Sequence, residues 1–254
     1  MPGKRVGIIQ SNYVPWKGYF DFIASVDEFV LFDDVQYTRR DWRNRNKIKT
    51  RDGLKWLTIP VDVKGKYFQT IDETRVADPS WIDEHLSTLH HTYAGAAHFR
   101  EEWSWIEAAY RSLEGAVLLS DVNRRLIERI CERLDISTQL RSSREFPRAE
   151  GKNERLLEIC RALGAAGYLS GPAARDYIDE SLWNANGISV AYKSYEGFPE
   201  YPQLYGPFEH GVTVLDVFFH VGPNARDYIR SAKVTLDRDG INAPLPADST
   251  RPGS

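Results

Sequence analysis

Polar side chains follow two short apolar runs near the start of the chain. Gln10, Ser11 and Asn12 come directly after the first run, and Asp33 and Asp34 come directly after the second. Amides and hydroxyls are the groups with which proteins fix uncharged polar ligands such as sugars or nucleobases. A carboxylate can bind a sugar hydroxyl, an amine or a metal ion. These residues therefore predict a site for a polar small molecule.

The same residues also have purely structural interpretations. Asn12 could cap its own backbone in a turn, and the two carboxylates could cap a backbone or pair with Arg39 or Arg40. Because side chains alternate along a strand, we expect one of Asp33 and Asp34 to point inward and the other toward the rim of the sheet. The sequence leaves both interpretations open.

The strongest charge run in the chain spans residues 37–51, YTRRDWRNRNKIKTR. Arginine forks match phosphate oxygens bidentately, so we expect Arg43, Arg45 and Lys47 to hold the phosphates of a small ligand. Nucleic-acid binding, with aromatic residues of the segment stacking on bases, and a merely solvated face are the alternatives. Nucleic acid is the less favoured partner, because the chain has a net charge of −3 and adds no matching basic surface elsewhere.

Histidines and cysteines give weaker signals. His210 lies in a loop rich in aromatic residues and is the best candidate for acid–base chemistry, although such a histidine can also be structural. His90 and His91 point to different sides of a helix, and no HExxH or CxxC pattern is present, so no metal site is predicted. Cys131 and Cys160 are expected to be buried free thiols. The absence of GxSxG, Walker and GxGxxG motifs argues against serine hydrolases, P-loop enzymes and dinucleotide dehydrogenases.

The elements that would position these residues alternate between strand and helix. Apolar runs with turn signals predict five strands, at residues 6–9, 29–32, 136–140, 167–171 and 188–192. This alternation predicts an α/β fold with a mainly parallel sheet. In such sheets ligands bind beyond the carboxyl ends of the strands, so the polar residues that follow the first two strands should share one rim.

Further elements are expected around this sheet. Residues 55–63 should form a strand in a hairpin with the basic segment, and residues 78–135 should form a helical insertion. Later helices are expected at 153–163, 172–177, 212–221 and 225–233. We expect a single domain over residues 5–235, followed by a flexible tail at 242–254.

The composition is that of an ordinary globular protein. The chain has 254 residues, of which 42% are hydrophobic and 27% are charged. No apolar run approaches the roughly 20 residues that span a bilayer, and no signal-peptide core follows the first residues. We therefore expect a cytoplasmic protein without a membrane span.

Several motifs together resemble the WbqC-like protein family. The resemblance runs in the family's order from about residue 5 to residue 233, and it rests on Gln10, Asn12-Tyr13, Pro15-Trp16, Gly18-Tyr19-Phe20, Asp33-Asp34-Val35-Gln36, Trp42, Asn44-Arg45-Asn46, Tyr168-Leu169-Ser170-Gly171, Tyr201-Pro202-Gln203 and Asp216. Family members usually begin with His-Gln-Pro, where this chain has Ile9-Gln10-Ser11. A role carried by that histidine therefore cannot be transferred.

The resemblance implies an enzyme of bacterial surface-polysaccharide (O-antigen) or modified-sugar biosynthesis. Its expected substrate is a nucleotide-linked sugar, to which it would transfer an acyl, aminoacyl or related group. The cofactor is not defined by the sequence, beyond a nucleotide or an acyl donor. Asp33, Asp34 and His210 are the expected catalytic residues. The expected substrate-binding residues are Gln10, Asn12, Tyr13, Trp16, Tyr19, Gln36, Arg43, Asn44, Arg45, Lys47, Ser170, Gln203 and Tyr205.

A second resemblance is to the Rossmann-like fold of HIGH-type nucleotidylyltransferases and pantothenate synthetase. Where those enzymes carry a His-x-Gly-His motif, this chain reads Trp16-Lys17-Gly18-Tyr19, and both histidines are missing. The resemblance implies that Lys17, the indole of Trp16 and the hydroxyl of Tyr19 contact phosphate. A nucleotidylyltransferase or ATP-dependent ligase is therefore an alternative function, and a non-catalytic module that binds glycan or nucleic acid is a third.

Overall fold

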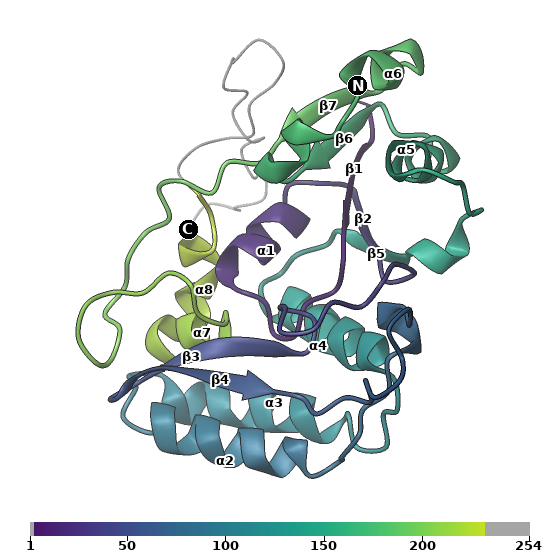
Figure 1. Ribbon diagram of the computed structural model, residues 1–254. Coiled ribbons are helices and arrows are strands. Elements are labelled where there is room, and N and C mark those ends of the chain that lie inside the picture. The colour runs from purple at the N-terminus through teal and green to yellow at the C-terminus, as the bar shows by residue number, and fades with distance from the viewer. Residues whose placement is uncertain (1–2, 232–254) are drawn as a thin grey trace.

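A five-stranded parallel sheet forms the centre of the molecule (Figure 1). The computed structural model describes residues 3–231, so the expected tail at 242–254 lies outside the described residues. The strand order is β5-β2-β1-β6-β7, with strands at Arg5–Ile9 (β1), Glu28–Leu31 (β2), Gln139–Ser142 (β5), Gly167–Ser170 (β6) and Ser189–Tyr192 (β7). This architecture confirms the predicted α/β Rossmann-like fold.

Strand alternation divides the core between the two faces of the sheet. Val6, Ile8 and Val30 face helices α5 (Lys152–Ala162) and α6 (Glu180–Ala185), whereas Phe29 and Leu31 face α1 (Lys17–Ile23) and α7 (Leu215–Val221). Figure 1 shows the two helix layers on opposite sides of the strands. Side chains that alternate in this way leave only the strand ends free for polar chemistry.

Close packing of α1 on the sheet depends on a glycine in β1. A Cβ atom on Gly7 would lie 2.4 Å from Cε1 of Phe22. Since neither the buried ring nor the backbone of the central strand has room to shift, any larger residue here would push α1 away. The glycine therefore sets how closely the first helix approaches the carboxyl ends of β1 and β2.

A long insertion separates β2 from β5. It begins with an antiparallel hairpin of β3 (Arg45–Thr50) and β4 (Gly53–Thr58), in which Lys47 pairs with Trp56, and this confirms the expected hairpin. Three helices follow, at Trp81–Tyr93 (α2), Phe99–Arg111 (α3) and Leu119–Arg133 (α4). In Figure 1 the hairpin and α4 lie below the carboxyl ends of β1 and β2. The insertion thus faces the edge at which α/β proteins bind ligands.

Several predicted boundaries shift for identifiable reasons. The third strand begins at Gln139 instead of residue 136, because the hydroxyl of Thr138 donates to the carbonyls of Ile23 and Val26 and turns the chain before the ladder starts. The helix predicted at 172–177 is a short 3-10 helix at Pro172–Asp176 (η3).

The C-terminal helices are also shorter than expected. α7 begins at Leu215, and the predicted helix at 225–233 is reduced within the described residues to α8 (Ala225–Tyr228). β4 ends at Thr58, ahead of Pro60, which lacks the N–H that a ladder needs. Over residues 3–231, no helix is long and apolar enough to cross a membrane.

Candidate functional site

The carboxyl ends of β1 and β2 meet at one buried carboxylate. The backbone N–H of Ser11 donates to Oδ1 of Asp33 over 2.8 Å, and the Ser11 hydroxyl also hydrogen-bonds that carboxyl group. Burial raises the pKa of Asp33 to about 6, and the hydrogen bonds from Ser11 only partly offset this effect. A carboxylate with such a pKa is ionised at neutral pH and still basic enough to accept a proton from a substrate.

Two residues of the insertion close over this strand end. The guanidinium of Arg43 donates to Oδ1 of Asn12 and, over 3.4 Å, to the carbonyl of Ser11. Nδ2 of Asn123, on α4, donates to the Ser11 hydroxyl over 3.1 Å and to the carbonyl of Arg43 over 2.9 Å. Oδ1 of Asn123 is buried without a hydrogen-bond partner. Polar groups from distant parts of the chain therefore cover the carboxyl ends of β1 and β2.

Asn123 was not among the expected site residues. The available signal was a polar residue on the apolar stripe of the helix predicted at 119–134, because Val122 and Leu126 mark the buried face on either side of it. A buried asparagine on such a stripe needs polar partners. Nothing local in the sequence indicates that those partners are Ser11 and Arg43.

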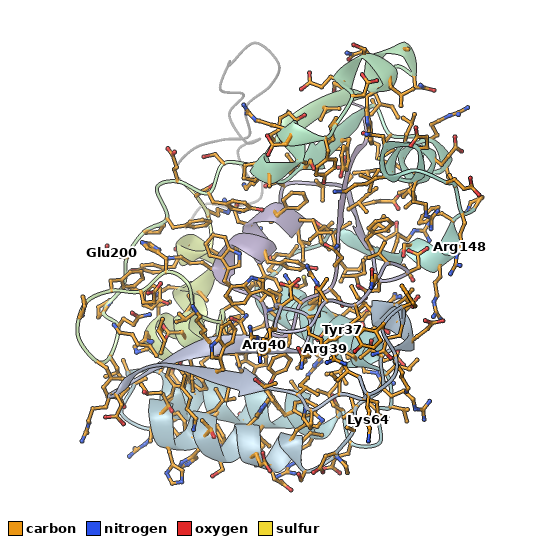
Figure 2. The ribbon with its side chains drawn as sticks, viewed as in Figure 1. Tyr37, Arg39, Arg40, Lys64, Arg148 and Glu200 are labelled. Carbon is orange, nitrogen blue, oxygen red and sulfur yellow. The ribbon has the colours of Figure 1, made fainter. Side chains whose placement is uncertain are left out.

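A pocket of about 260 Å³ lies between the loop after β2 and the end of the hairpin. Its polar wall comes from the basic segment, and Figure 2 shows three of these residues, Tyr37, Arg39 and Arg40, between the carboxyl ends of β1 and β2 and the hairpin. The wall is completed by Asn44 and Arg45, and residues 58–61 with Val63 form the opposite wall. We call this the arginine pocket. Its size suits a phosphate or a sugar phosphate, rather than a whole nucleotide-linked sugar.

The arginine pocket is basic and contains unused polar atoms. Three arginines line it and no carboxylate does. Oδ1 of Asn44 and Nε of Arg45 are buried and lack hydrogen-bond partners. Arg45 also donates to the carbonyl of Arg40, whose φ of 59° lies in the left-handed region. Unsatisfied buried polar atoms and a strained backbone are typical of ligand sites, since a ligand can supply the missing partner.

Other residues of the basic segment face elsewhere. Lys47 lies over two exposed tryptophans, with Nζ 5.8 Å from the ring of Trp42 and 5.1 Å from that of Trp56. The guanidinium of Arg45 lies 4.0 Å over Trp56, so one arginine contributes to both the pocket and this aromatic surface. Gln36 is exposed, and its Nε2 donates to the carbonyl of Tyr67 over 2.8 Å.

Asp34, the second acidic residue after β2, is bound to other side chains of the protein. Asp34 is paired with Arg155 of α5 over 2.9 Å and accepts a hydrogen bond from the Ser143 hydroxyl. Asp33 and Asp34 do face opposite sides, but both side chains are buried, so the expectation that one reaches the open rim is wrong. The alternative in which these carboxylates pair with Arg39 or Arg40 is wrong for Asp34, because its salt-bridge partner is Arg155.

Three aromatic residues expected to contact ligand lie in the interior. The hydroxyl of Tyr13 shares hydrogen bonds with Nδ1 of His85 at 2.7 Å and with Tyr110 at 2.6 Å. Tyr19 is buried and donates to the carbonyl of Gln10 over 3.1 Å. Trp16 is half-buried and packs against the rings of Tyr195 and Phe198, which is the core-packing alternative.

The lysine of the segment that corresponds to the HIGH-type motif contacts other parts of the protein interior. Nζ of Lys17 donates to the carbonyl of Pro199 over 2.9 Å and lies over three aromatic rings. Burial lowers the pKa of Lys17 to about 8.

Ser170, at the end of β6, is buried and donates to the hydroxyl of Tyr168 over 3.3 Å.

Among the C-terminal candidates, Gln203 contacts a second buried carboxylate, whereas Tyr205 and His210 contact other groups. Gln203 donates from Nε2 to Oδ1 of Asp216 over 2.7 Å and accepts from Nζ of Lys49 over 2.8 Å. Tyr205 donates to a carbonyl of α2, and His210 is half-buried with an unpartnered Nδ1. Burial and the nearby Lys17 charge lower the pKa of His210. None of the three lines the arginine pocket.

The cysteines and the metal-ligating side chains can be placed as well. Cys131 and Cys160 are buried free thiols, as expected. Within the described part of the chain, no group of three or more His, Cys, Asp or Glu side chains could hold a metal ion.

The fold and these residues define an α/β protein with a buried carboxylate at the ends of its first two strands and a basic pocket beside the hairpin. The chain belongs to the WbqC-like protein family, whose sequence profile matches residues 10–228. It is 48% identical over 227 residues to the uncharacterized protein Rv1507c of Mycobacterium tuberculosis, a similarity that covers 89% of this chain and 98% of that protein. No solved structure matches this chain.

Proposed function

We propose that this protein transfers an acyl, aminoacyl or related group to a nucleotide-linked sugar in the biosynthesis of a bacterial surface polysaccharide or modified sugar. The arginine pocket is the observation that carries the proposal. It combines three guanidinium groups with two unsatisfied polar atoms at the carboxyl edge of a parallel sheet. That combination suits the phosphates of a nucleotide-linked sugar.

The pocket's contacts support a phosphate ligand over a neutral one. The side chain of Arg40 is exposed at the pocket and free to turn toward a ligand, and Arg39 is held there by its bond to the carbonyl of Val63 over 2.6 Å. The unpartnered Nε of Arg45 adds a third donor. A doubly charged diphosphate would satisfy these donors, whereas a neutral glycan would leave guanidinium charges uncompensated.

Asp33 would take the proton that the transfer releases. A hydroxyl or amine of the sugar attacks the carbonyl carbon of the donor, a new C–O or C–N bond forms, and the bond to the donor's leaving group breaks. The attacking group loses one proton, and Asp33 is the acceptor with a pKa of about 6. Ser11 and Asn123 orient that carboxylate through their hydrogen bonds at the strand end.

Binding of nucleotide-linked sugars tests the pocket directly. We expect UDP- or GDP-linked sugars to raise the melting temperature of the wild-type protein, because they bind only the folded state. Arg40→Gln and Arg45→Gln should each weaken the affinity measured by calorimetry by roughly 10-fold to 100-fold, since a hydrogen bond to a charged group contributes about 1.5–3 kcal/mol. Arg51→Gln is the matched control, because Arg51 is exposed in the turn between β3 and β4. Equal affinities in all three variants would contradict the proposal.

A separate variant tests the chemistry. Asp33→Asn should keep the nucleotide-sugar affinity and lose turnover, because the amide cannot accept the proton. Product formation from an acyl donor and a nucleotide-linked sugar, followed by mass spectrometry, is the measurement. Unchanged turnover in Asp33→Asn would remove this residue from the reaction.

A non-catalytic glycan-binding module is a second candidate. The exposed rings of Trp42 and Trp56, whose centroids are 5.2 Å apart, favour it because sugar rings pack on such surfaces. In that case Trp56→Ala would weaken binding of free oligosaccharides, and no donor would be consumed.

A further inference from the structure

The loop after β4 presents two strongly exposed aromatic side chains. Tyr67 is 72% exposed and Phe68 is 89% exposed, the highest values among the large hydrophobic residues of the described chain. Lys64 and Lys66 are exposed beside them, and Gly65, with φ of 75°, makes the turn between the two lysines. A single exposed hydrophobic side chain is common, but two adjacent aromatic rings with this exposure form an apolar patch on which a partner can pack.

The segment from residue 37 to residue 68, which contains this loop and the hairpin, is strongly basic. Residues 37–68 contain ten lysines and arginines and three aspartates, an excess of seven positive charges in a chain whose net charge is −3. Four of the cations are engaged within the protein, because Arg43 lies 3.6 Å from Asp41, Lys49 is buried, and Arg39 and Arg45 donate to backbone carbonyls. Most of the others are exposed. The exposed cations therefore favour an extended anionic partner.

Apolar exposure follows the same segment. Trp42, Leu54 and Trp56 are also among the exposed large hydrophobics, and together with Tyr67 and Phe68 they make up most of that set in the described residues. Aromatic rings interspersed with lysines and arginines are typical of proteins that lie on a membrane surface, where the rings enter the interface and the cations meet lipid phosphates.

We propose that the face formed by residues 37–68 docks on an anionic lipid bilayer, with Tyr67 and Phe68 entering the interfacial layer. Charge complementarity selects the anionic surface, and the apolar loop tip selects a bilayer over a nucleic acid. A nucleic acid would need its aromatic residues along a basic groove for stacking. Here the most exposed rings stand at the end of a loop.

This contact would bring the arginine pocket to the membrane. The guanidinium of Arg39 lies 5.7 Å from the ring centroid of Tyr67 and donates to the carbonyl of Val63, which lines the pocket. Gln36 holds the carbonyl of Tyr67 as well. Docking through the loop tip would therefore place the pocket beside the lipid head groups.

Co-sedimentation of the full-length protein with lipid vesicles tests this inference. We expect binding to vesicles of phosphatidylcholine with 40% phosphatidylglycerol and at least tenfold weaker binding to pure phosphatidylcholine, because the cations need anionic lipid. The double variant Tyr67→Ser/Phe68→Ser should lower the partition coefficient on the anionic vesicles at least tenfold. The control is Tyr177→Ser, since Tyr177 is an exposed aromatic residue outside the face and should leave vesicle binding unchanged.

Three results would overturn the inference. They are an absence of binding to anionic vesicles, equal binding to both vesicle types, and unchanged binding of the double variant. Tighter binding to a single-stranded oligonucleotide that the double variant also loses would assign the face to nucleic acid instead. The nucleotide-sugar affinity of the double variant should stay at the wild-type value, so failure of membrane docking and failure of the proposed activity are distinguishable.

Discussion

Two buried carboxylates of this protein occupy opposite electrostatic situations. Asp216, on α7, accepts hydrogen bonds from Tyr93 at 3.0 Å and from Tyr201 and Gln203 at 2.7 Å each. Burial by itself raises the pKa of Asp216, but the hydrogen bonds from His220, Tyr201 and Gln203 outweigh burial and hold the pKa below its usual value. Asp216 is thus stabilised as an anion.

Asp33 has a similar burial but fewer donors. Its hydrogen bonds come from Ser11 alone, and burial raises its pKa to about 6. The difference between the two sites is the number of donors that point at the carboxylate, since their burial is nearly the same. A buried carboxylate that accepts several hydrogen bonds stabilises the fold. A buried carboxylate with few hydrogen-bond donors can exchange a proton with a substrate.

The two environments also fit their places in the fold. Asp216 ties the aromatic loop at residues 196–211 to α7, because Tyr201 and Gln203 both reach it from that loop. Asp33 lies where β1 and β2 end, and it accepts a hydrogen bond from Ser11 there. We therefore assign structural importance to Asp216 and chemical importance to Asp33, and each assignment can be tested by substitution.

The largest effect is expected for Asp216→Asn. The amide group would place an N–H₂ against donors of Tyr93 and Gln203 and break a saturated buried network, which costs roughly 3–5 kcal/mol. Denaturant unfolding at pH 7 is the measurement. Asp33→Asn is the matched control, and we expect it to be at least as stable as the wild type at that pH. Equal losses in the two variants would remove the distinction between the two carboxylates.

The pH dependence of stability should separate the same pair. The folded-state pKa of Asp33, about 6, lies above its ordinary value of 3.8, so the unfolded chain releases this proton first as the pH rises. Asp33 therefore lowers stability progressively between about pH 4 and pH 6, by on the order of 3 kcal/mol. The difference in unfolding free energy between wild type and Asp33→Asn should grow across this range, and parallel curves would contradict the raised pKa.

Asp216 should show the opposite sign. Its folded-state pKa is depressed, so its contribution to stability is present above its ordinary pKa of 3.8 and is lost as the pH falls below that value. The difference in unfolding free energy between Asp33→Asn and Asp33→Asn/Asp216→Asn between pH 2 and pH 5 isolates this contribution, because other carboxylates with lowered pKa values, such as Glu28, are present in both proteins.

A smaller effect is expected for Ser11→Ala. The variant loses the hydroxyl bond to Asp33 and the acceptor for Nδ2 of Asn123, at a cost of about 0.5–1.5 kcal/mol. Because the hydroxyl lowers the pKa of Asp33, its removal should move the pH-dependent loss of stability to higher pH. Titration of Asp33 by carboxyl carbon NMR is the direct measurement. An unchanged pKa would show that the backbone N–H of Ser11 is the only effective donor.

The smallest effect on stability is expected for His210→Gln. Its Nδ1 has no partner and its side chain is half-buried, so the change in unfolding free energy should stay within about 0.5 kcal/mol. Its lowered pKa keeps the ring neutral at pH 7. Loss of turnover without loss of stability would give His210 the acid–base role expected from the sequence, and unchanged turnover would leave it structural.

Local patterns in the sequence were sufficient for the central sheet and the hairpin. Apolar runs bounded by turn residues located all five parallel strands within about three residues, and the Gly53 turn indicated the β3–β4 pairing. The meeting of Ser11 with Asp33 followed as well, because carboxyl ends of neighbouring parallel strands lie at one edge. These features depend on short-range periodicity and on one topological rule.

Local sequence patterns could not predict the hydrogen-bond and salt-bridge partners that come from distant segments of the chain. Asp34 is paired with Arg155, 121 residues away, and Asn123 reaches Ser11 across 112 residues. Tyr13 looked like a ligand contact from its place in the motif but is bonded to Tyr110 in the core. Periodicity reports which face of an element is apolar, and it carries no record of which distant side chain covers a polar group.

The sequence by itself therefore determined the α/β class, the polar strand ends and the basic segment after β2. Only the tertiary structure decided which cations face a pocket and which are internal, since Arg45 lines the pocket while Lys49, four residues on, is buried against Gln203. It also decided that Asp33 accepts hydrogen bonds from few donors and that Asp216 accepts them from several. The physical reason is that desolvation and the number of hydrogen-bond donors are properties of the assembled environment, which residues far apart in the chain create together.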